Sequence, residues 1–188
     1  MRKGRQIRCF ATDFRAAETE NERHIEGYFS TFEGVYVIAP GVEESVDRGA
    51  FDGALDDDIR ALINHETRLV LGRTTVGTLV LRVDEKGLWG RITINQEDQD
   101  AMNLYARVKR GDVSQCSFGF DILDEKREVK EDGTVHYIIL RVKLYEVSVV
   151  TFPAYRDTAV EARAEDIKQA KMRQLEAWRE KQKARLRS

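Results

Sequence analysis

Three segments of the chain carry side chains of the types that acyl transfer needs. His65 lies in Asn64-His65-Glu66, Ser117 begins the segment Ser-Phe-Gly-Phe, and Glu146 begins a largely apolar run that extends to Tyr155. A serine hydroxyl becomes a useful nucleophile when a neighbouring imidazole takes its proton, and a third group helps by holding that imidazole in one tautomer. Together the segments therefore supply a nucleophile, a base and a carboxylate.

Strand alternation favours Ser117 over Ser114 as the nucleophile. In an extended segment over residues 113–122, the even-numbered residues form the natural core face and Ser114 points with them, whereas Ser117 and Gly119 lie on the opposite face. Gly119 leaves space where a substrate backbone can approach. Taken alone, a serine in a strand is more often a solvated or hydrogen-bonded hydroxyl, so the choice depends on the other two segments.

Cys116 is the competing nucleophile, because a thiolate forms more easily than an alkoxide. Its position on the apolar face instead predicts an inert, buried side chain of small hydrophobic character.

The base and the carboxylate each have an alternative interpretation. His65 ends the apolar stretch 59–63, which predicts a strand leaving the core, while His24 and His136 are interpreted as structural. Glu146 shares a strand face with Ser148, and a carboxylate within such an apolar run needs a partner.

That partner is either His65, which the carboxylate would orient, or an arginine such as Arg141 in a structural pair. Glu66 is a rival for the orienting role.

The elements that must position these residues are mostly strands. Residues 25–32 form an early strand region, 78–83 and 88–94 a hairpin around 84–87, and 113–123 with 135–142 a second hairpin that turns at 131–133. A further strand covers 144–151 and stops before Pro153. Helices are predicted over 48–58 and over 97–109, the latter from an apolar face formed by Ala101, Leu104, Tyr105 and Val108.

Composition limits the class of protein. The 188 residues fit one domain with an appendage, and 34% charged with 41% hydrophobic residues is ordinary for a soluble protein. Neither membrane insertion nor secretion is supported, since there is no run of 18 apolar residues and no apolar signal region. Cys9 and Cys116, far apart in the chain, suggest a reducing compartment without disulfides.

Metal and cofactor chemistry is not indicated. Three scattered histidines and two scattered cysteines give neither His-Glu-x-x-His nor Cys-x-x-Cys spacing, and phosphate-loop and dinucleotide fingerprints are absent. We therefore expect no metal and no cofactor.

The chain divides into a body, residues 1–160, and a charged tail, residues 161–188. The tail holds nine Lys or Arg against five Asp or Glu, and the body is acidic. Good helix formers without Gly or Pro predict a helix from about residue 159, either a solvated end or a tether to a partner. Interspersed acids and a single aromatic, Trp178, argue against a specific nucleic-acid contact.

In order and spacing, these segments resemble the prohead protease family of tailed bacteriophages, the serine endopeptidases that mature capsids. The resemblance runs from about His24 to about Arg163. Besides the His65, Ser117 and Glu146 segments, it rests on Arg48-Gly49-Ala50-Phe51, Leu71-Gly72-Arg73-Thr74, Asp84-Glu85-Lys86-Gly87-Leu88 and Arg110-Gly111-Asp112.

The resemblance implies a mainly β, α+β fold similar to herpesvirus assemblin: a closed or nearly closed β-barrel with peripheral helices, followed by a C-terminal helix. It also implies a triad of Ser117 as nucleophile, His65 as base and Glu146 as orienting carboxylate. Assemblins have a second histidine in place of this glutamate. The oxyanion would be stabilised either by backbone N–H groups or by an arginine, for which Arg73 and Arg141 are candidates.

The implied function is cleavage of the scaffolding segment of the major capsid protein, and of the protease itself, in the assembling prohead in the host cytoplasm. A homodimer is compatible with this interpretation. The alternative from another class is a non-catalytic scaffold or capsid-interaction protein of the prohead.

Overall fold

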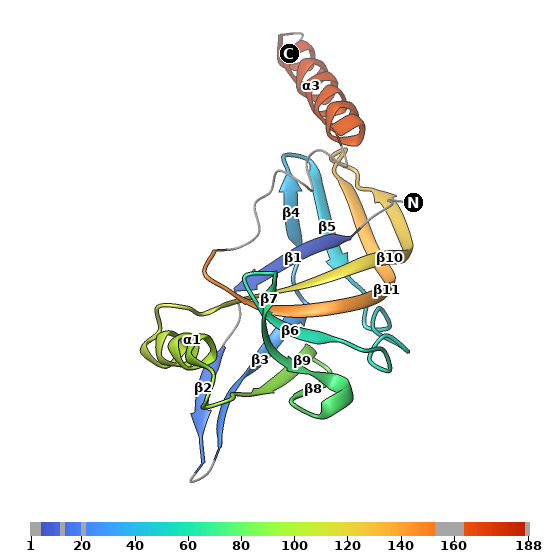
Figure 1. The fold of residues 1–188 in the computed structure, drawn as a ribbon. Coiled ribbons are helices and arrows are strands. Elements are labelled where there is room, and N and C mark those ends of the chain that lie inside the picture. Colours follow the sequence, from blue (N-terminus) through green and yellow to red (C-terminus); the bar gives the residue numbers. More distant parts are fainter. Residues whose placement is uncertain (1–4, 12–13, 20–21, 153–163, 187–188) are drawn as a thin grey trace.

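The computed structural model describes residues 5–11, 14–19, 22–152 and 164–186, which form two β-sheets and two α-helices (Figure 1). The first sheet has the strand order β1-β10-β11-β5-β4, and β6 and β7 extend it from β11. Its strands are β1 (Gln6–Ala11), β4 (Tyr36–Ala39), β5 (Val42–Val46), β6 (Arg60–Ile63), β7 (Glu66–Arg73), β10 (Gln115–Val129) and β11 (Val135–Val150).

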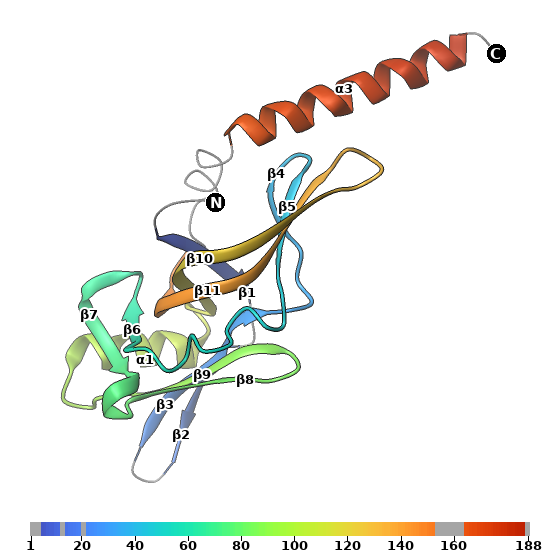
Figure 2. The same cartoon turned by 90° about the vertical axis from the view of Figure 1, so that its right-hand side faces the viewer.

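The second sheet has the order β2-β3-β9-β8 and lies against one face of the first (Figures 1 and 2). Its strands are β2 (Arg15–Glu18), β3 (Arg23–Thr31), β8 (Leu79–Val83) and β9 (Gly87–Thr93). The predicted hairpin around residues 84–87 is therefore confirmed. Helix α1 (Gln99–Arg110) packs against β2 and β3, and helix α3 (Ala164–Leu186) follows the sheets.

The long hairpin of β10 and β11 is the centre of the first sheet. The two strands pair antiparallel, as predicted, and turn through residues 130–134, where Gly133 has a φ of 82°. The predicted strands over 135–142 and 144–151 are one strand, β11. Its second edge pairs in parallel with β5 near its start and with β6 near its end.

The expected closed or nearly closed barrel is wrong. Among the described strands, the first sheet runs as an open path between β1 and β4, and the second is a separate sheet. The physical reason is that the second edge of β11 is used by two short parallel strands, while the remaining strands pack face to face on the first sheet and do not continue its hydrogen-bond ladder.

The core lies between the two sheets. Cys116, Phe118, Phe120 and Ile122 on β10 belong to the core cluster, as predicted, and the other face of the strand is buried as well, at Ser117 and Gly119. Phe118 stacks on Phe120 and meets Phe51 edge-on. Ser114 departs from the prediction: it is exposed, because it precedes the first paired residue of β10.

Of the two predicted internal helices, only that over 97–109 forms. α1 buries the expected face of Ala101, Leu104, Tyr105 and Val108, and it is capped by Asp98 and Gly111. The helix predicted over 48–58 is wrong, because that segment is a series of turns. Gly49 and Gly53, the latter at a φ of 72°, weaken helix formation, while Ala50, Phe51 and Ala54 are still buried.

The predicted C-terminal helix is present as α3, and Trp178 on it is exposed. The boundary between body and tail, Pro153 and the expected helix start at 159 lie outside the described residues, so the division into 1–160 and 161–188 stays a prediction. No helix among the described residues is both long and apolar enough to cross a membrane.

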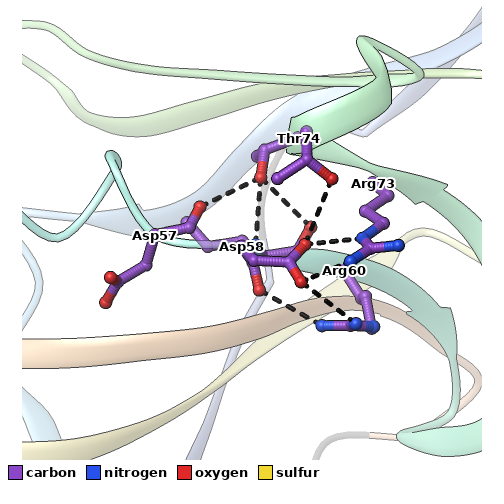
Figure 3. A network of polar contacts seen from close by, with 7 residues as sticks. Asp57, Asp58, Arg60, Arg73 and Thr74 are labelled. Atoms are coloured by element: carbon purple, nitrogen blue, oxygen red, sulfur yellow. Dashed lines mark hydrogen bonds and ion pairs between the residues drawn. The ribbon is translucent and has the colours of Figure 1, made fainter.

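A polar network closes the base of the β6–β7 hairpin (Figure 3). The carboxylate of Asp58 accepts two hydrogen bonds of 2.6 Å from Arg73, at the end of β7, and one of 3.1 Å from Arg60, at the start of β6. Thr74 donates to the carbonyl of Asp57 at 3.0 Å and accepts from the backbone N–H of Ile59 at 3.0 Å. These contacts tie the two ends of the hairpin together.

The network predicts a contribution to acid stability. Hydrogen bonding from Arg73, with the charge of Arg60, lowers the pKa of Asp58 from 3.8 to about 2. Because the folded-state pKa is depressed, the stabilisation is present above about pH 4 and is lost as the pH falls toward 2. We expect Asp58→Asn to lower the melting temperature at pH 6 and to flatten its pH dependence between 4 and 2.

Thermal melts across that range test the prediction, with Asp56→Asn as the control, because Asp56 lies in the same loop but takes no part in the bonds from Arg73 and Arg60 to Asp58. If the melting temperatures of wild type and Asp58→Asn fell in parallel between pH 4 and pH 2, the result would contradict this prediction.

Candidate active site

His65 lies where the chain leaves β6 and turns into β7. Asn64 and His65 have φ values of 48° and 62°, which non-glycine residues seldom adopt. The turn is held on the end of β11: the N–H of Asn64 donates to the carbonyl of Val149 at 3.0 Å, and its side-chain oxygen accepts from the N–H of Thr151 at 2.8 Å. The predicted position of His65 at the exit of a core strand is therefore confirmed.

A 2.7 Å hydrogen bond joins Nδ1 of His65 to Oε1 of Glu146. The side chains are 20% and 5% exposed, so water competes little for this contact. An imidazole that donates its Nδ1 proton to a carboxylate keeps the lone pair of Nε2 for accepting another proton. Nε2 is shielded from solvent in this structure. With the proton on Nδ1, the pair has the orientation that a general base requires.

Ser148 completes this cluster. Its hydroxyl donates to Oε2 of Glu146 at 2.6 Å and accepts from the backbone N–H of His65 at 3.3 Å. Ser148 is fully buried. Both oxygens of the buried carboxylate therefore have protein partners.

Ser117 lies on β10 directly opposite Ser148 on β11. Side chains directly opposite in an antiparallel pair have their Cβ atoms about 4.5–5.5 Å apart, so Ser117 shares a sheet face with Glu146 and Ser148. Its own hydroxyl, which is fully buried, donates to the backbone carbonyl of Arg8 on β1 at 2.9 Å. The hydroxyl proton of Ser117 is thus directed toward β1 in this structure and not toward His65.

Strand β1 is held by a buried ion pair. The guanidinium of Arg8 contacts both carboxylate oxygens of Glu44 on β5, with 3.1 Å between Nη2 and Oε2, and both side chains are less than 5% exposed. This pair fixes the strand whose carbonyl receives the Ser117 hydroxyl.

Gly119 lies opposite Glu146 in the same ladder. A Cβ at this position would lie 2.2 Å from Oε1 of Glu146. The space beside Ser117 that the sequence predicts for a substrate backbone is therefore occupied by the carboxylate of Glu146.

Several alternative candidates lie elsewhere. Glu66 contacts Arg68 at 3.3 Å, and hydrogen bonding from that arginine lowers the pKa of Glu66. Glu146 is hydrogen-bonded to His65. The alternative interpretation, in which Glu146 pairs with Arg141, is therefore wrong. Arg73, a candidate for the oxyanion, binds Asp58 at the base of the hairpin.

The remaining histidines and the cysteine also have local contacts. His24 lies 3.2 Å from Glu22, His136 bonds the hydroxyl of Ser45 at 2.8 Å, and the Sγ of Cys116 lies 2.8 Å from the carbonyl of Tyr28. Cys116 is a free, fully buried cysteine, and the side chain of Cys9 lies outside what the structure describes. In the described part of the chain, no group of three His, Cys, Asp or Glu is arranged to hold a metal ion.

Sequence reasoning missed the contacts of Ser148 and Arg8. The alternation of side chains along β11 places Ser148 on the same face as Glu146. The bond between Ser148 and the backbone of His65, however, depends on the pairing of β6 with β11. No pattern in residues 6–11 indicates that the carbonyl of Arg8 meets Ser117.

Comparison with known proteins gives one match, which covers most of the chain. A family model described as caudovirus prohead serine protease matches residues 10–173. No curated protein matches significantly. No solved structure matches significantly either.

The position of Gly119 predicts that Gly119→Ala disturbs the His65–Glu146 pair. The added methyl group must displace the carboxylate, which two hydrogen bonds hold in place, and such overpacking typically costs about 1–3 kcal/mol. We expect a lower melting temperature and loss of the hydrogen-bonded Nδ1–H signal of His65 in ¹H NMR spectra. Gly49→Ala is the control, because the nearest atoms to its added Cβ lie at 3.4 Å. An unchanged Nδ1–H signal in Gly119→Ala would contradict the prediction.

Proposed function

The chain belongs to the caudovirus prohead serine protease family, and on that premise we propose that Ser117, His65 and Glu146 form its catalytic triad. Family membership makes it a serine peptidase of the assembling prohead. The single observation that carries the proposal is the 2.7 Å bond between His65 and Glu146 on the sheet face that Ser117 shares. A serine, an imidazole and a carboxylate in this relation support acyl transfer.

In the proposed mechanism, Oγ of Ser117 attacks a peptide carbonyl while Nε2 of His65 takes the hydroxyl proton. Glu146 holds the Nδ1 proton and stabilises the imidazolium that forms. His65 then gives the proton to the leaving amine, and water hydrolyses the acyl-enzyme by the same route. No metal takes part in this sequence of steps.

The reaction requires a rearrangement at Ser117. Its hydroxyl must turn from the carbonyl of Arg8 toward His65, and a substrate carbonyl must reach a side chain that is fully buried here. Catalytic hydrogen bonds are often formed only in the complex with substrate, so this geometry is compatible with the proposed roles. It corresponds to a closed form of the site.

We propose as substrates the scaffolding segment of the major capsid protein and the protease itself, cut inside the prohead in the host cytoplasm. The support for these substrates is the family's role in the prohead. A homodimer is compatible with the proposal. The alternative, a non-catalytic scaffold or capsid-interaction protein, differs in one measurable way, because a scaffold needs no nucleophile.

The first test replaces the nucleophile and the base. Ser117→Ala and His65→Ala should each lower the rate of processing by about 10⁴- to 10⁶-fold, because the members of a catalytic unit depend on one another. The assay is a time course of the purified chain with assembled proheads, read by intact mass, which also locates the cleavage sites. Circular dichroism and melting temperature check that each variant is folded.

Cys116→Ser is the matched control for that test. The serine hydroxyl can donate to the carbonyl of Tyr28, which already lies 2.8 Å from the sulfur, so the core should tolerate it and processing should continue. If Cys116→Ser stops processing while Ser117→Ala does not, the nucleophile is wrongly assigned. Normal processing by folded Ser117→Ala and His65→Ala would favour the scaffold.

Glu146→Gln tests the carboxylate separately. The amide keeps nearly the same shape but removes the charge that stabilises the imidazolium, so we expect a large loss of kcat from this substitution. If Glu146 acts only as a structural partner, activity should fall only in proportion to the unfolded fraction measured by thermal melting.

A further inference from the structure

Ser148 connects two parts of the cluster that come from different elements. It lies on β11, two residues after Glu146, and it bonds both the side chain of Glu146 and the backbone of His65. A serine hydroxyl has one proton and two lone pairs. Here the proton goes to Oε2 of Glu146, and a lone pair receives the N–H of His65.

These contacts form a closed ring of hydrogen bonds. The ring runs from the backbone N–H of His65 to Oγ of Ser148, from that hydroxyl to Oε2 of Glu146, and from Oε1 back to the Nδ1 proton of His65. Each member fixes the next, because neither carboxylate oxygen can rotate away without breaking a bond. The ring holds both the imidazole and the backbone that carries it.

The backbone of His65 needs such support. Its φ of 62° lies in the left-handed region, which a non-glycine residue occupies only when its surroundings hold it there. The neighbouring turn residue Asn64 is tied to the end of β11 by its own bonds. Ser148 supplies the corresponding bond for His65.

We propose that Ser148 is a positioning residue for the reaction, which aims the Glu146 carboxylate at Nδ1 of His65 and anchors the backbone of the base. This inference rests on the proposed triad. We assign Ser148 no nucleophilic role, because its hydroxyl is engaged both as donor to Glu146 and as acceptor from the backbone of His65. Its effect on the chemistry is transmitted entirely through Glu146 and His65.

The position of Ser148 relative to Ser117 strengthens this assignment. The two serines are directly opposite in the β10–β11 ladder, and both are fully buried. If the Ser148 hydroxyl were free to rotate, it could offer its proton to Ser117 or compete for Nε2 of His65. The bond to Glu146 keeps that hydroxyl on the Nδ1 side of the imidazole.

Ser148→Ala tests the proposal. In metal sites, removing the partner that orients a ligand typically costs about 10- to 100-fold in activity, and we expect a similar range for this orienting hydroxyl. We expect a loss of kcat of this size with KM unchanged, because Ser148 does not contact the substrate in the proposed mechanism. We also expect the Nδ1–H resonance of His65 to shift or to broaden through faster exchange with water. Ser148→Thr, which keeps the hydroxyl, should recover both kcat and the resonance.

Ser30→Ala is the matched control, because Ser30 is also fully buried in a strand but belongs to β3 of the second sheet. It should leave kcat and the resonance unchanged. Ser148→Cys provides a second variant if the alanine protein is unstable. Its side chain has nearly the same shape as serine, but the thiol is only a weak hydrogen-bond donor, so this variant should also lower kcat. Melting temperatures allow each kcat to be corrected for the fraction of protein that is folded.

Failure of the positioning role of Ser148 and failure of the proposed triad give different results. Wild-type kcat and an unchanged Nδ1–H resonance in folded Ser148→Ala overturn the positioning role, as does an equal loss in Ser30→Ala. Full activity of Ser117→Ala would instead overturn the triad. The resonance is measured without substrate, so it tests the hydrogen-bond ring even in that case.

Discussion

The antiparallel pairing of β10 with β11 is the interaction on which the rest of this structure depends. It sets Ser117 opposite Ser148 and Gly119 opposite Glu146, while Phe118 and Val147 face the core. Because side chains alternate with a period of two, a slip of one residue would send the polar set into the core. The hydrophobic packing of the other face thus fixes the register of the site.

His65 is added to this ladder by a separate element. The β6–β7 hairpin joins β11 through short parallel pairing, and the Asp58 network closes its base while the turn at its other end carries His65. Two consecutive residues with positive φ are costly, and their cost is offset by bonds to Val149, Thr151 and Ser148. Backbone strain therefore lies where the hairpin meets the end of β11.

The site is polar yet almost completely buried. A carboxylate and two serines are buried on one sheet face, and such groups are tolerated only when they are hydrogen-bonded. Glu146 and Ser148 satisfy each other and His65, whereas Ser117 is satisfied by β1. The hydrogen bond to Arg8 that satisfies the buried hydroxyl of Ser117 also directs that hydroxyl away from His65. Both buried serine hydroxyls of this sheet face are therefore satisfied by bonds that do not join Ser117 to His65.

The sequence by itself determined the local features and the family. Alternation placed Ser117 off the core face and Glu146 beside Ser148, and the apolar periodicity of residues 97–109 identified α1, because these patterns depend on neighbours two to four positions away. Only the tertiary structure decided that the sheets stay open and that Glu146 rather than Glu66 meets His65. Those outcomes depend on which strands pair across more than 80 residues, and such pairing is selected by the packing of the whole core, which no local pattern encodes.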